Sequence, residues 1–417
     1  METAPKSLRL QIGLFGRTNV GKSSFLNMVA GQDVSITSPL PGATTDIVEK
    51  AMEMLPIGPV VLLDTGGLDD ESRLAPERLR KTRHVFDRAD VFVLLVEPGV
   101  WGDSETRIVD AAAARKAPCI VVVNKTDLGG PSPAFIQEMH ARTPHVCLAS
   151  SIGANEMERN RCVDDFKRQL LATLPEDYLR APPLIGDLLP PGGLAVLVVP
   201  IDLQAPKGRL ILPQVQTIRD ALDNDSAALV VKERELSHVL GMLRRPPDVV
   251  VCDSQVVLKM VADAPPDVKC TTFSILFARQ KGDLNEMARG VAAIERLEAG
   301  DKILVSEACS HHAIEDDIGR VKIPRWLRQY VGVDVQIDLN SGRDYPPNLA
   351  EYKLVIHCGA CMLTRREMLF RIHQARRANV PITNYGVCIS FLQGVAKRVL
   401  SPFPSALDAF EQQIARI

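Results

Sequence analysis

The sequence of 417 residues has no strong net charge of either sign and no long apolar segment. Its 49 basic and 51 acidic residues exclude the overall positive charge that favours binding to nucleic acid or to an anionic membrane. No apolar run approaches the roughly 18 to 20 residues that a membrane-spanning helix needs. The first residues, 1–6, lack the apolar core of a signal peptide. We therefore expect a cytoplasmic protein without a nucleic-acid or membrane partner.

The chain contains nine cysteines, and its length allows two or three domains that each bury a core. In a reducing compartment, cysteines in this number favour metal binding or redox chemistry over a framework of disulfides.

A phosphate-binding motif follows the first predicted strand, residues 8–14. The eight residues that begin at Gly16 and end at Ser23 fit the pattern G-x-x-x-x-G-K-[ST]. Backbone N–H groups of such a loop wrap phosphate oxygens, and the helix predicted for residues 23–30 points its positive end at them. We expect Lys22 to reach the β- and γ-phosphates and Ser23 to ligate Mg²⁺. The residues expected to contact the nucleotide here are Gly16, Arg17, Thr18, Asn19, Val20, Gly21, Lys22, Ser23 and Ser24.

Two further strands end in polar motifs that complete a nucleotide site. Asp64 follows residues 60–63 and is placed to hold the Mg²⁺ shell, while the backbone of Gly67 can turn toward a γ-phosphate. Asn124, Lys125 and Asp127 follow a strand predicted for residues 119–123. The Asp127 carboxylate can accept two N–H bonds from guanine, whereas adenine would leave it unpaired. The sequence therefore predicts that the nucleotide is GTP.

Taken together, these motifs resemble the G domains of the TrmE/Era group. The resemblance implies that residues 42–46 form switch I, with Thr44 as a Mg²⁺ ligand, and that Lys22, Thr44, Asp64 and Gly67 are catalytic. Ser150 and Ser151 match the guanine-contacting loop only loosely. Leu68 stands where Ras-like enzymes carry a water-orienting Gln. Asn19 matches the asparagine that helps to hold K⁺ in this group, which implies slow, cation-stimulated GTP hydrolysis.

The middle of the chain begins with a segment of linker composition, residues 175–193, which contains five prolines and three glycines. Apolar runs at 194–201, 227–231 and 248–252 alternate with helical patterns. We expect a three-stranded sheet whose edges need covering, so self-association into a homodimer or a larger oligomer is its most economical role. A simple spacer remains the alternative.

Cysteine and histidine recur together in the last part of the chain. The predicted elements of this part indicate a doubly wound sheet, with strands at 271–277, 302–305, 334–337, 353–356 and 381–384 and helices at 283–297 and 365–378. Cys309, His311 and His312 lie just past one strand, and His357, Cys358 and Cys361 lie past another. Such sheets bind ligands beyond the carboxyl ends of their strands, so the two loops are expected to face one metal site. The alternative is that the cysteines are buried and inert.

The whole pattern, a G domain followed by a small α/β module, a Cys-x-His motif and a His-Cys-x-x-Cys motif, resembles the [FeFe]-hydrogenase maturation GTPase family, HydF. That resemblance implies an iron–sulfur scaffold and carrier. It would accept a diiron H-cluster precursor made with two radical-SAM enzymes, HydE and HydG, and pass it to the apo-hydrogenase. It also implies a [4Fe-4S] cluster held by Cys309, Cys358 and Cys361. His311 and His357 are then the first candidates for a weaker fourth ligand, and a carboxylate or water is the alternative. Of the other cysteines, Cys388 is the one that could approach the site, since it follows the strand predicted at 381–384.

The predicted domains are a GTPase domain (1–174), a linker (175–193), an α/β dimerisation domain (194–264) and a doubly wound α/β iron–sulfur-binding domain (265–417). Two alternatives keep the GTPase. In one, Cys309, His311, Cys358 and Cys361 form a structural Cys₃His zinc site. In the other, the protein is an RNA-modifying or ribosome-associated GTPase, an alternative supported only by a cluster of arginines that includes Arg365 and Arg366. Because cations are disfavoured at the start of a helix, these two arginines are also predicted to face an anionic cluster.

Overall fold

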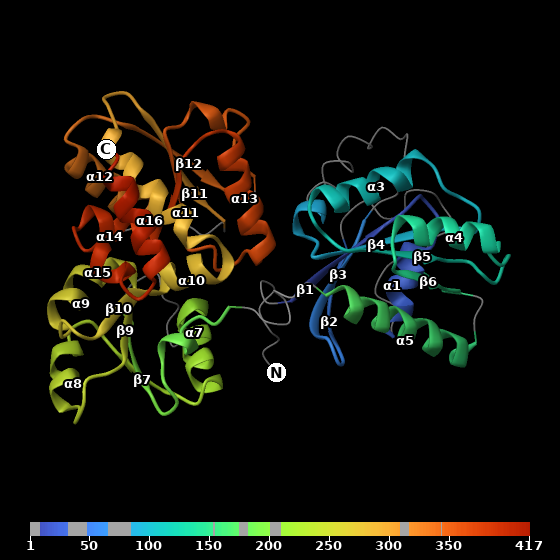
Figure 1. Cartoon of the computed structure of the whole chain (residues 1–417), viewed down its shortest axis with the longest axis horizontal. Helices are drawn as coiled ribbons and strands as arrows, with labels where there is room; N and C mark the ends of the chain where they lie inside the picture. Colours follow the sequence, from blue (N-terminus) through green and yellow to red (C-terminus); the bar gives the residue numbers. More distant parts are fainter. Residues whose placement is uncertain are drawn as a thin grey trace. The chain divides into compact units, whose positions relative to one another are not determined.

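The structure is a computed structural model that describes residues 9–31, 48–65, 85–152, 155–174, 182–200, 210–308, 317–342 and 344–417. The chain divides into two compact units, Met1–Ala181 and Pro182–Ile417 (Figure 1). Within the described ranges, no helix combines the length and the apolar character that crossing a membrane requires.

The first unit is built on a six-stranded sheet with the strand order β2-β3-β1-β4-β5-β6. Among the described strands of this sheet, β2 alone runs antiparallel to its neighbour. The strands are β1 (Leu10–Phe15), β2 (Val48–Met54), β3 (Gly58–Asp64), β4 (Val91–Val96), β5 (Cys119–Val123) and β6 (Val146–Leu148). Because the parallel strands are covered on both faces, their sequences are mostly apolar rather than alternating, with Gln11 in β1 as an exception.

Helices cover both faces of this sheet (Figure 1). On one face, α1 (Lys22–Ala30) and α5 (Glu156–Thr173) pack through Phe25 and Phe166 against every second strand residue, such as Ile12 and Val93. On the other face, α3 (Asp103–Ala114) and α4 (Pro133–Arg142) pack against the intervening residues, such as Phe92 and Leu94. The predicted helix after the phosphate motif is confirmed, and it ends at Gly31 in the left-handed conformation (φ 66°).

The second unit contains two four-stranded parallel sheets with the same topology. The first sheet has the order β10-β9-β7-β8 and the second has the order β12-β11-β13-β14. The strands are β7 (Leu194–Val198), β8 (Ala227–Val231), β9 (Val249–Cys252), β10 (Lys269–Thr272), β11 (Lys302–Glu307), β12 (Gln336–Ser341), β13 (Leu354–His357) and β14 (Ile382–Asn384). In each sheet the second strand is added on one side of the first strand, and the third and fourth strands are added on the other side. The point where the strand order changes side is a switch point, where ligands commonly bind. In the second sheet this switch point lies between β11 and β13.

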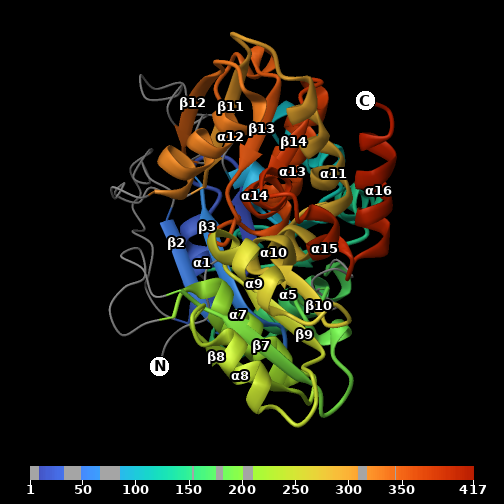
Figure 2. The ribbon, with the colours of Figure 1, turned by 90° about the vertical axis from the view of Figure 1, so that its left-hand side faces the viewer.

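Helices surround and join these two sheets. They are α7 (Leu212–Asp223), α8 (Leu236–Met242), α9 (Val257–Asp263), α10 (Phe273–Lys281), α11 (Leu284–Gly290), α12 (Ile323–Val331), α13 (Arg365–Arg377), α14 (Tyr385–Leu392), α15 (Ala396–Leu400) and α16 (Pro404–Ile414). Helix α10 packs on α7 and on α13 and α14, so it lies between the two sheets (Figure 2). In the second sheet, α13 lies on the side opposite α12 and α14 (Figure 1). One hydrophobic core runs continuously through both sheets.

The prediction of a strand at residues 271–277 is wrong in most of its length. The strand ends at Thr272, whose hydroxyl accepts a hydrogen bond from the Ile275 N–H and caps α10. A buried helix and a buried strand both read as a short apolar run, so hydrophobicity alone did not distinguish them. The strand that remains, β10, pairs with β9, so the middle sheet has four strands and not the predicted three.

Part of the predicted linker is also packed. Leu184, Ile185, Leu188 and Leu189 are buried in the core of the second unit. Proline and glycine content identifies turns, but it does not show whether the turns pack on a core. The predicted helix 283–297 is confirmed in its first half as α11, and its second half, Val291–Arg296, winds into a 3₁₀ helix.

Candidate nucleotide site and metal loop

The phosphate loop leaves β1 directly at Gly16. Gly16 has φ 149°, and a Cβ there would lie 2.6 Å from the carbonyl oxygen of Leu95. The loop turns over the start of α1, where the Lys22 Nζ donates to the carbonyl oxygens of Gly16 (3.0 Å) and Arg17 (2.7 Å). The ammonium group therefore lies inside the loop that the motif predicts for phosphate binding.

Two predicted Mg²⁺-site residues meet at the edge of the sheet. The Ser23 Oγ donates to the Asp64 Oδ2 at 2.7 Å, although 41 positions separate them in sequence. Asp64 is fully buried at the end of β3, which pairs with β1. Hydroxyl and carboxylate oxygens are the ligands that Mg²⁺ prefers. Thr44, Gly67 and Leu68 lie outside the described residues.

The guanine-motif residues are tied to the phosphate loop. The Asn124 Nδ2 donates to the carbonyl oxygen of Val20 (2.9 Å), and its Oδ1 accepts from the Ser151 N–H (3.2 Å) and Oγ (2.8 Å). The Ser150 Oγ donates to the Asp127 Oδ1 at 2.7 Å. The loop with Ser150 and Ser151 therefore lies beside Asn124 and Asp127, where a guanine-contacting loop is needed. Lys125 forms an ion pair with Glu97 at 2.5 Å.

An ion pair that no sequence motif indicates joins the phosphate loop to α3. The Arg17 guanidinium donates to both carboxylate oxygens of Glu105, at 2.7 and 2.8 Å, and Glu105 also accepts from the Gly102 N–H at 2.9 Å. Burial alone would raise the pKa of Glu105, but the hydrogen bonds from Arg17 and the backbone outweigh it and hold that pKa below its ordinary value. Only the spacing from Gly102 to Glu105 could have suggested the helix cap, and nothing in the sequence pairs Glu105 with Arg17.

The cysteine motif begins where β13 ends. β13 pairs with β11 so that His357 stands opposite Ser306, and Cys309 comes three residues after Ser306. The Cys358 N–H donates to the Ser306 carbonyl oxygen (2.9 Å), and the Ala308 N–H points to the Cys358 Sγ (3.3 Å). The Cys358 thiol is thus held against the carboxyl end of β11. Cys309, His311 and His312 lie outside the described residues, and the residues that are described contain no group of three metal-ligating side chains.

His357 is fully buried, and its two ring nitrogens differ in their contacts. The Nδ1 lies 2.8 Å from the Cys358 carbonyl oxygen. A carbonyl only accepts, so Nδ1 carries the proton and Nε2 carries a lone pair. Nε2 has no hydrogen-bond partner among the described residues. Burial, together with the positive charge of Arg371, lowers the pKa of His357 to about 3. A neutral imidazole with one nitrogen anchored and the other buried and bare fits a metal ligand.

Two buried cations flank the cysteine turn, and both were absent from the predicted site. The Lys281 Nζ donates to the carbonyl oxygens of Cys361 (2.9 Å) and Leu363 (3.0 Å). The Arg371 Nη2 donates to the Ser306 Oγ (2.5 Å), and the guanidinium stacks on the Tyr345 ring at 4.3 Å from its centroid. Burial lowers the pKa of Lys281 to about 8. Burial raises the pKa of the Cys361 thiol, and Lys281 partly offsets that rise.

Arg365 makes backbone contacts that the prediction of an anionic cluster did not include. Its Nη1 donates to the carbonyl oxygens of Gln280 (2.6 Å) and Gly282 (3.4 Å), at the end of α10. The negative end of α10 therefore compensates an arginine at the positive end of α13, and these contacts do not require an anionic cluster. Cys388 is fully buried in α14, where burial raises the pKa of its thiol to about 12.

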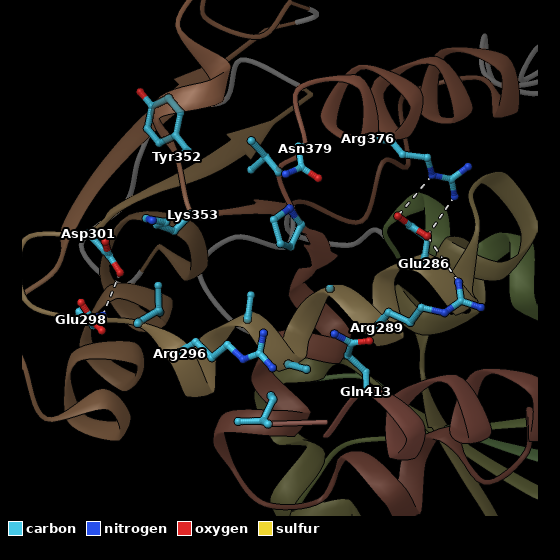
Figure 3. A pocket seen from close by; sticks show the side chains of 17 residues that line it. Glu286, Arg289, Arg296, Glu298, Asp301, Tyr352, Lys353, Arg376, Asn379 and Gln413 are labelled. Atoms are coloured by element: carbon cyan, nitrogen blue, oxygen red, sulfur yellow. Dashed lines mark hydrogen bonds and ion pairs between the residues drawn. The ribbon is translucent and has the colours of Figure 1, made fainter. Parts of the chain in front are cut away.

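A separate pocket of about 580 Å³ lies at the other end of the second sheet (Figure 3). Asp301, Lys353 and Pro381 line it just before β11, β13 and β14 begin. Its charged groups include Glu286, which pairs with Arg376 at 3.0 Å. Among its described lining residues there is no cysteine or histidine, so this pocket is distinct from the cysteine turn at the carboxyl ends of the strands.

Comparison with known proteins identifies both units. Residues 11–125 match the family described as 50S ribosome-binding GTPase, and together with the phosphate loop, the Ser23–Asp64 pair and the guanine motif this makes the first unit a P-loop GTPase domain. Residues 184–282 match the hydrogen maturase F dimerization domain, and residues 285–402 match the hydrogen maturase F tetramerization domain. These two matches cover more than half of the chain. The chain belongs to the hydrogen maturase F family, as the resemblance in the sequence implied.

Individual curated relatives that match part of this chain are GTPases, the same class as the first unit. The tRNA modification GTPase MnmE of Synechococcus sp. (strain JA-3-3Ab) is 38% identical over 155 residues, which are 36% of this chain and 32% of that protein. MnmE of Syntrophobacter fumaroxidans is 32% identical over 182 residues, which are 42% of this chain and 37% of that protein. The chain thus spans about a third of the length of the curated relatives it matches.

Solved structures show lower similarity. Aquifex aeolicus Era bound to GDP and AlF₄⁻ is 18% identical, with a TM-score of 0.35 over 56% of this chain and 98% of Era. The G domain of the T. maritima FeoB iron transporter is 18% identical, with a TM-score of 0.30 over 40% of this chain and 99% of that domain. These values are too low to bear on function.

Proposed function

We propose that this protein is a GTP-hydrolysing scaffold and carrier for maturation of the [FeFe]-hydrogenase H-cluster, acting in the cytoplasm. It binds a [4Fe-4S] cluster and transfers a diiron precursor, made with HydE and HydG, to the apo-hydrogenase. The observation that supports this most directly is the switch point of the second sheet. Its two neighbouring strands, β11 and β13, lead into Cys309 on one side and into Cys358 and Cys361 on the other.

The proposed ligand set leaves one iron with a weaker ligand. Cys309, Cys358 and Cys361 supply three thiolates, and a cubane cluster takes four ligands. His357, with its buried and bare Nε2, and His311 are the candidates for the fourth. A position held by a weak ligand can exchange it, which a scaffold requires in order to bridge a second metal unit and release it.

In the proposed nucleotide site, Lys22, Thr44, Asp64 and Gly67 act on GTP and Mg²⁺, and Ser23 and Thr44 ligate the metal. Asn19 stands exposed in the phosphate loop with φ 63° and is proposed as a K⁺ ligand. The test compares GTP hydrolysis in matched K⁺ and Na⁺ salts, in the wild type and in Asn19→Ala. We expect faster hydrolysis in K⁺ and loss of that difference in the variant. Equal rates of GTP hydrolysis in both salts for the wild type would contradict the proposed K⁺ site.

Two other functions remain to be separated by experiment. A structural zinc site would use Cys309, His311, Cys358 and Cys361. An RNA-related role is suggested by the MnmE relatives, which are tRNA modification GTPases, but the chain matches only about a third of their length. RNA binding that weakens as salt rises would support that role.

The decisive experiment measures iron, acid-labile sulfide and zinc, and records the absorption spectrum, for anaerobically purified protein. We expect about four iron and four sulfide per chain and a broad visible charge-transfer band, as a [4Fe-4S] cluster requires. Cys358→Ser and Cys361→Ser should each lose the band and the iron. One zinc per chain without sulfide would contradict the proposal and favour the structural metal site.

A further inference from the structure

Lys281, the last residue of α10, is buried at the cysteine turn with only 3% of its surface exposed. Its ammonium donates to the carbonyl oxygens of Cys361 and Leu363, at 2.9 and 3.0 Å, and lies 5.1 Å from the centre of the Phe277 ring. Across the described parts of the chain, no carboxylate lies within 4 Å of it. Lys281 therefore has no direct ion pair among those residues, although the charge of the buried Glu367 carboxylate acts on it from farther away.

Such an arrangement is costly. Taking an ammonium out of water costs several kcal/mol, and neutral carbonyl oxygens return only part of that free energy. A neutral hydrogen-bond donor could serve the same two carbonyl oxygens without placing a charge in the core. The charge is therefore best explained by a negative group that reaches the turn when the site is loaded.

The surroundings of Lys281 indicate where that negative charge belongs. Its two acceptors bracket the end of the Cys358–Cys361 turn, and its charge acts on the Cys361 thiol. Arg371, which is also buried, reaches the other side of the turn through Ser306 and acts on His357. Both positive charges therefore converge on the segment that carries the cysteine ligands.

We propose that Lys281 is a positioning residue for an anionic metal–thiolate centre at Cys358 and Cys361. Its ammonium is the counter-charge of that centre, and its two hydrogen bonds hold the backbone of the turn in the shape that presents the thiolates. This inference rests on the proposed function. Lys281 is not itself a ligand, because its donors are directed to the two carbonyl oxygens.

The proposal has two measurable consequences. A positive charge beside a cluster stabilises the more negative, reduced form, so its removal makes the midpoint potential more negative. In the metal-free protein this charge has no ion pair among the described residues. Loss of the charge should therefore reduce the rise in melting temperature that metal loading produces.

The test compares the full-length wild type with Lys281→Met and Lys281→Arg, with Lys259→Met as the control. Lys259 is a surface lysine paired with Asp263. Iron per chain, the midpoint potential from an electron paramagnetic resonance titration, and melting temperatures with and without the cluster are measured. We expect Lys281→Met to shift the potential negative and to lose part of the stabilisation on loading. Lys281→Arg should restore both, and Lys259→Met should change neither.

The possible failures can be told apart. If Lys281→Met loads wild-type iron with a wild-type potential and the same stabilisation on loading, the inference is overturned and the proposed function stands. If the wild type itself binds no iron, the proposed function fails and the inference fails with it. Should Lys281→Met not fold, Lys281→Gln removes the charge but keeps a hydrogen-bond donor, and the same measurements decide.

Discussion

At the nucleotide site, one side chain joins three segments of the chain. Asn124 donates to Val20 in the phosphate loop and accepts from Ser151 in the neighbouring loop. Ser150 in that same loop donates to Asp127. The carboxylate expected to contact guanine is therefore oriented by residues that belong to the same small network.

Asp127→Ala should weaken GTP binding by about 2 kcal/mol, or roughly 30-fold, because two hydrogen bonds from guanine to a charged acceptor are lost. Binding of a fluorescent GTP analogue, with competition by ATP, measures this change. Ser150→Ala removes only the donor that orients Asp127 and should have a smaller effect. Unchanged preference for GTP over ATP in Asp127→Ala would contradict the assignment of Asp127.

Glu105→Gln should lower stability at pH 7 by about 1–3 kcal/mol, since the charged acceptor of Arg17 and the Gly102 N–H is lost. The pKa of Glu105 is lowered in the folded state, so its contribution is present above the ordinary value of 4.5 and is lost as pH falls through the folded pKa. The difference in the free energy of unfolding between Glu105→Gln and the wild type should thus become smaller in acid.

The measurement is urea unfolding followed by Trp101 fluorescence in a Trp326→Phe background, because the chain has only these two tryptophans. Trp101 lies beside α3, where its Nε1 donates to Thr106, so it reports on the first unit. If the difference in unfolding free energy between variant and wild type stays constant as the pH falls, the charge of Glu105 is not the cause of the lost stability.

At the scale of secondary-structure elements, the cysteines of the second sheet differ in the strand or helix that carries them. Cys358 and Cys361 follow a strand at the switch point, where loops leave the sheet together. Cys388 lies inside α14 and is fully buried in the core. Cys358 and Cys361 are the proposed ligands, whereas Cys388 packs in the core.

Cys388→Ser should therefore retain iron, sulfide and the visible absorption band, whereas Cys358→Ser should lose all three. The serine hydroxyl in the core should cost about 1–3 kcal/mol of stability unless it finds a partner, so the melting temperature is measured alongside the iron. Cys388→Ala is the matched control, because it removes the thiol without adding a polar group. Loss of the cluster in a folded Cys388→Ala protein would indicate a closed site of four cysteines and no exchangeable iron.

At the scale of the whole molecule, the two units have separate hydrophobic cores. Lys22→Ala should abolish GTP binding, since the loop loses its only lysine, and should leave iron per chain unchanged. Iron analysis and nucleotide binding on the same preparation test this. Parallel loss of iron would mean that the metal loop requires a bound nucleotide.

Self-association should depend on an exposed apolar stripe of α7 in the region that matches the dimerization domain. Val215 and Leu222 lie seven residues apart and therefore on one face of the helix, and Leu222 is 57% exposed. Leu222→Lys should weaken the oligomer roughly tenfold or more, because burying a leucine contributes about 1.5–3 kcal/mol. Light scattering across a dilution series measures the mass. Leu128→Lys, in the first unit and 80% exposed, is the control and should leave the mass unchanged.

Local pattern was sufficient for the elements whose chemistry is contained in a short segment. The phosphate motif, the Asp64 strand end, Asn124 with Asp127, and the Cys-x-x-Cys turn after β13 were all located from the sequence. In each, the order of strand, turn residue and polar side chain is determined by neighbours along the chain. The family resemblance came from the same motifs and their order, and the family comparison confirms it.

Tertiary structure alone decided the features that depend on distant segments. The pairing of Arg17 with Glu105, the approach of Lys281 to Cys361 and the contact of Arg365 with the end of α10 each join residues about 80 or more positions apart. The division of the 271–277 run between β10 and α10 also depended on packing, because both elements are buried and apolar. Side-chain charge and hydrophobicity are properties of the sequence, but the partner that compensates a charge or covers an apolar face is selected by the fold.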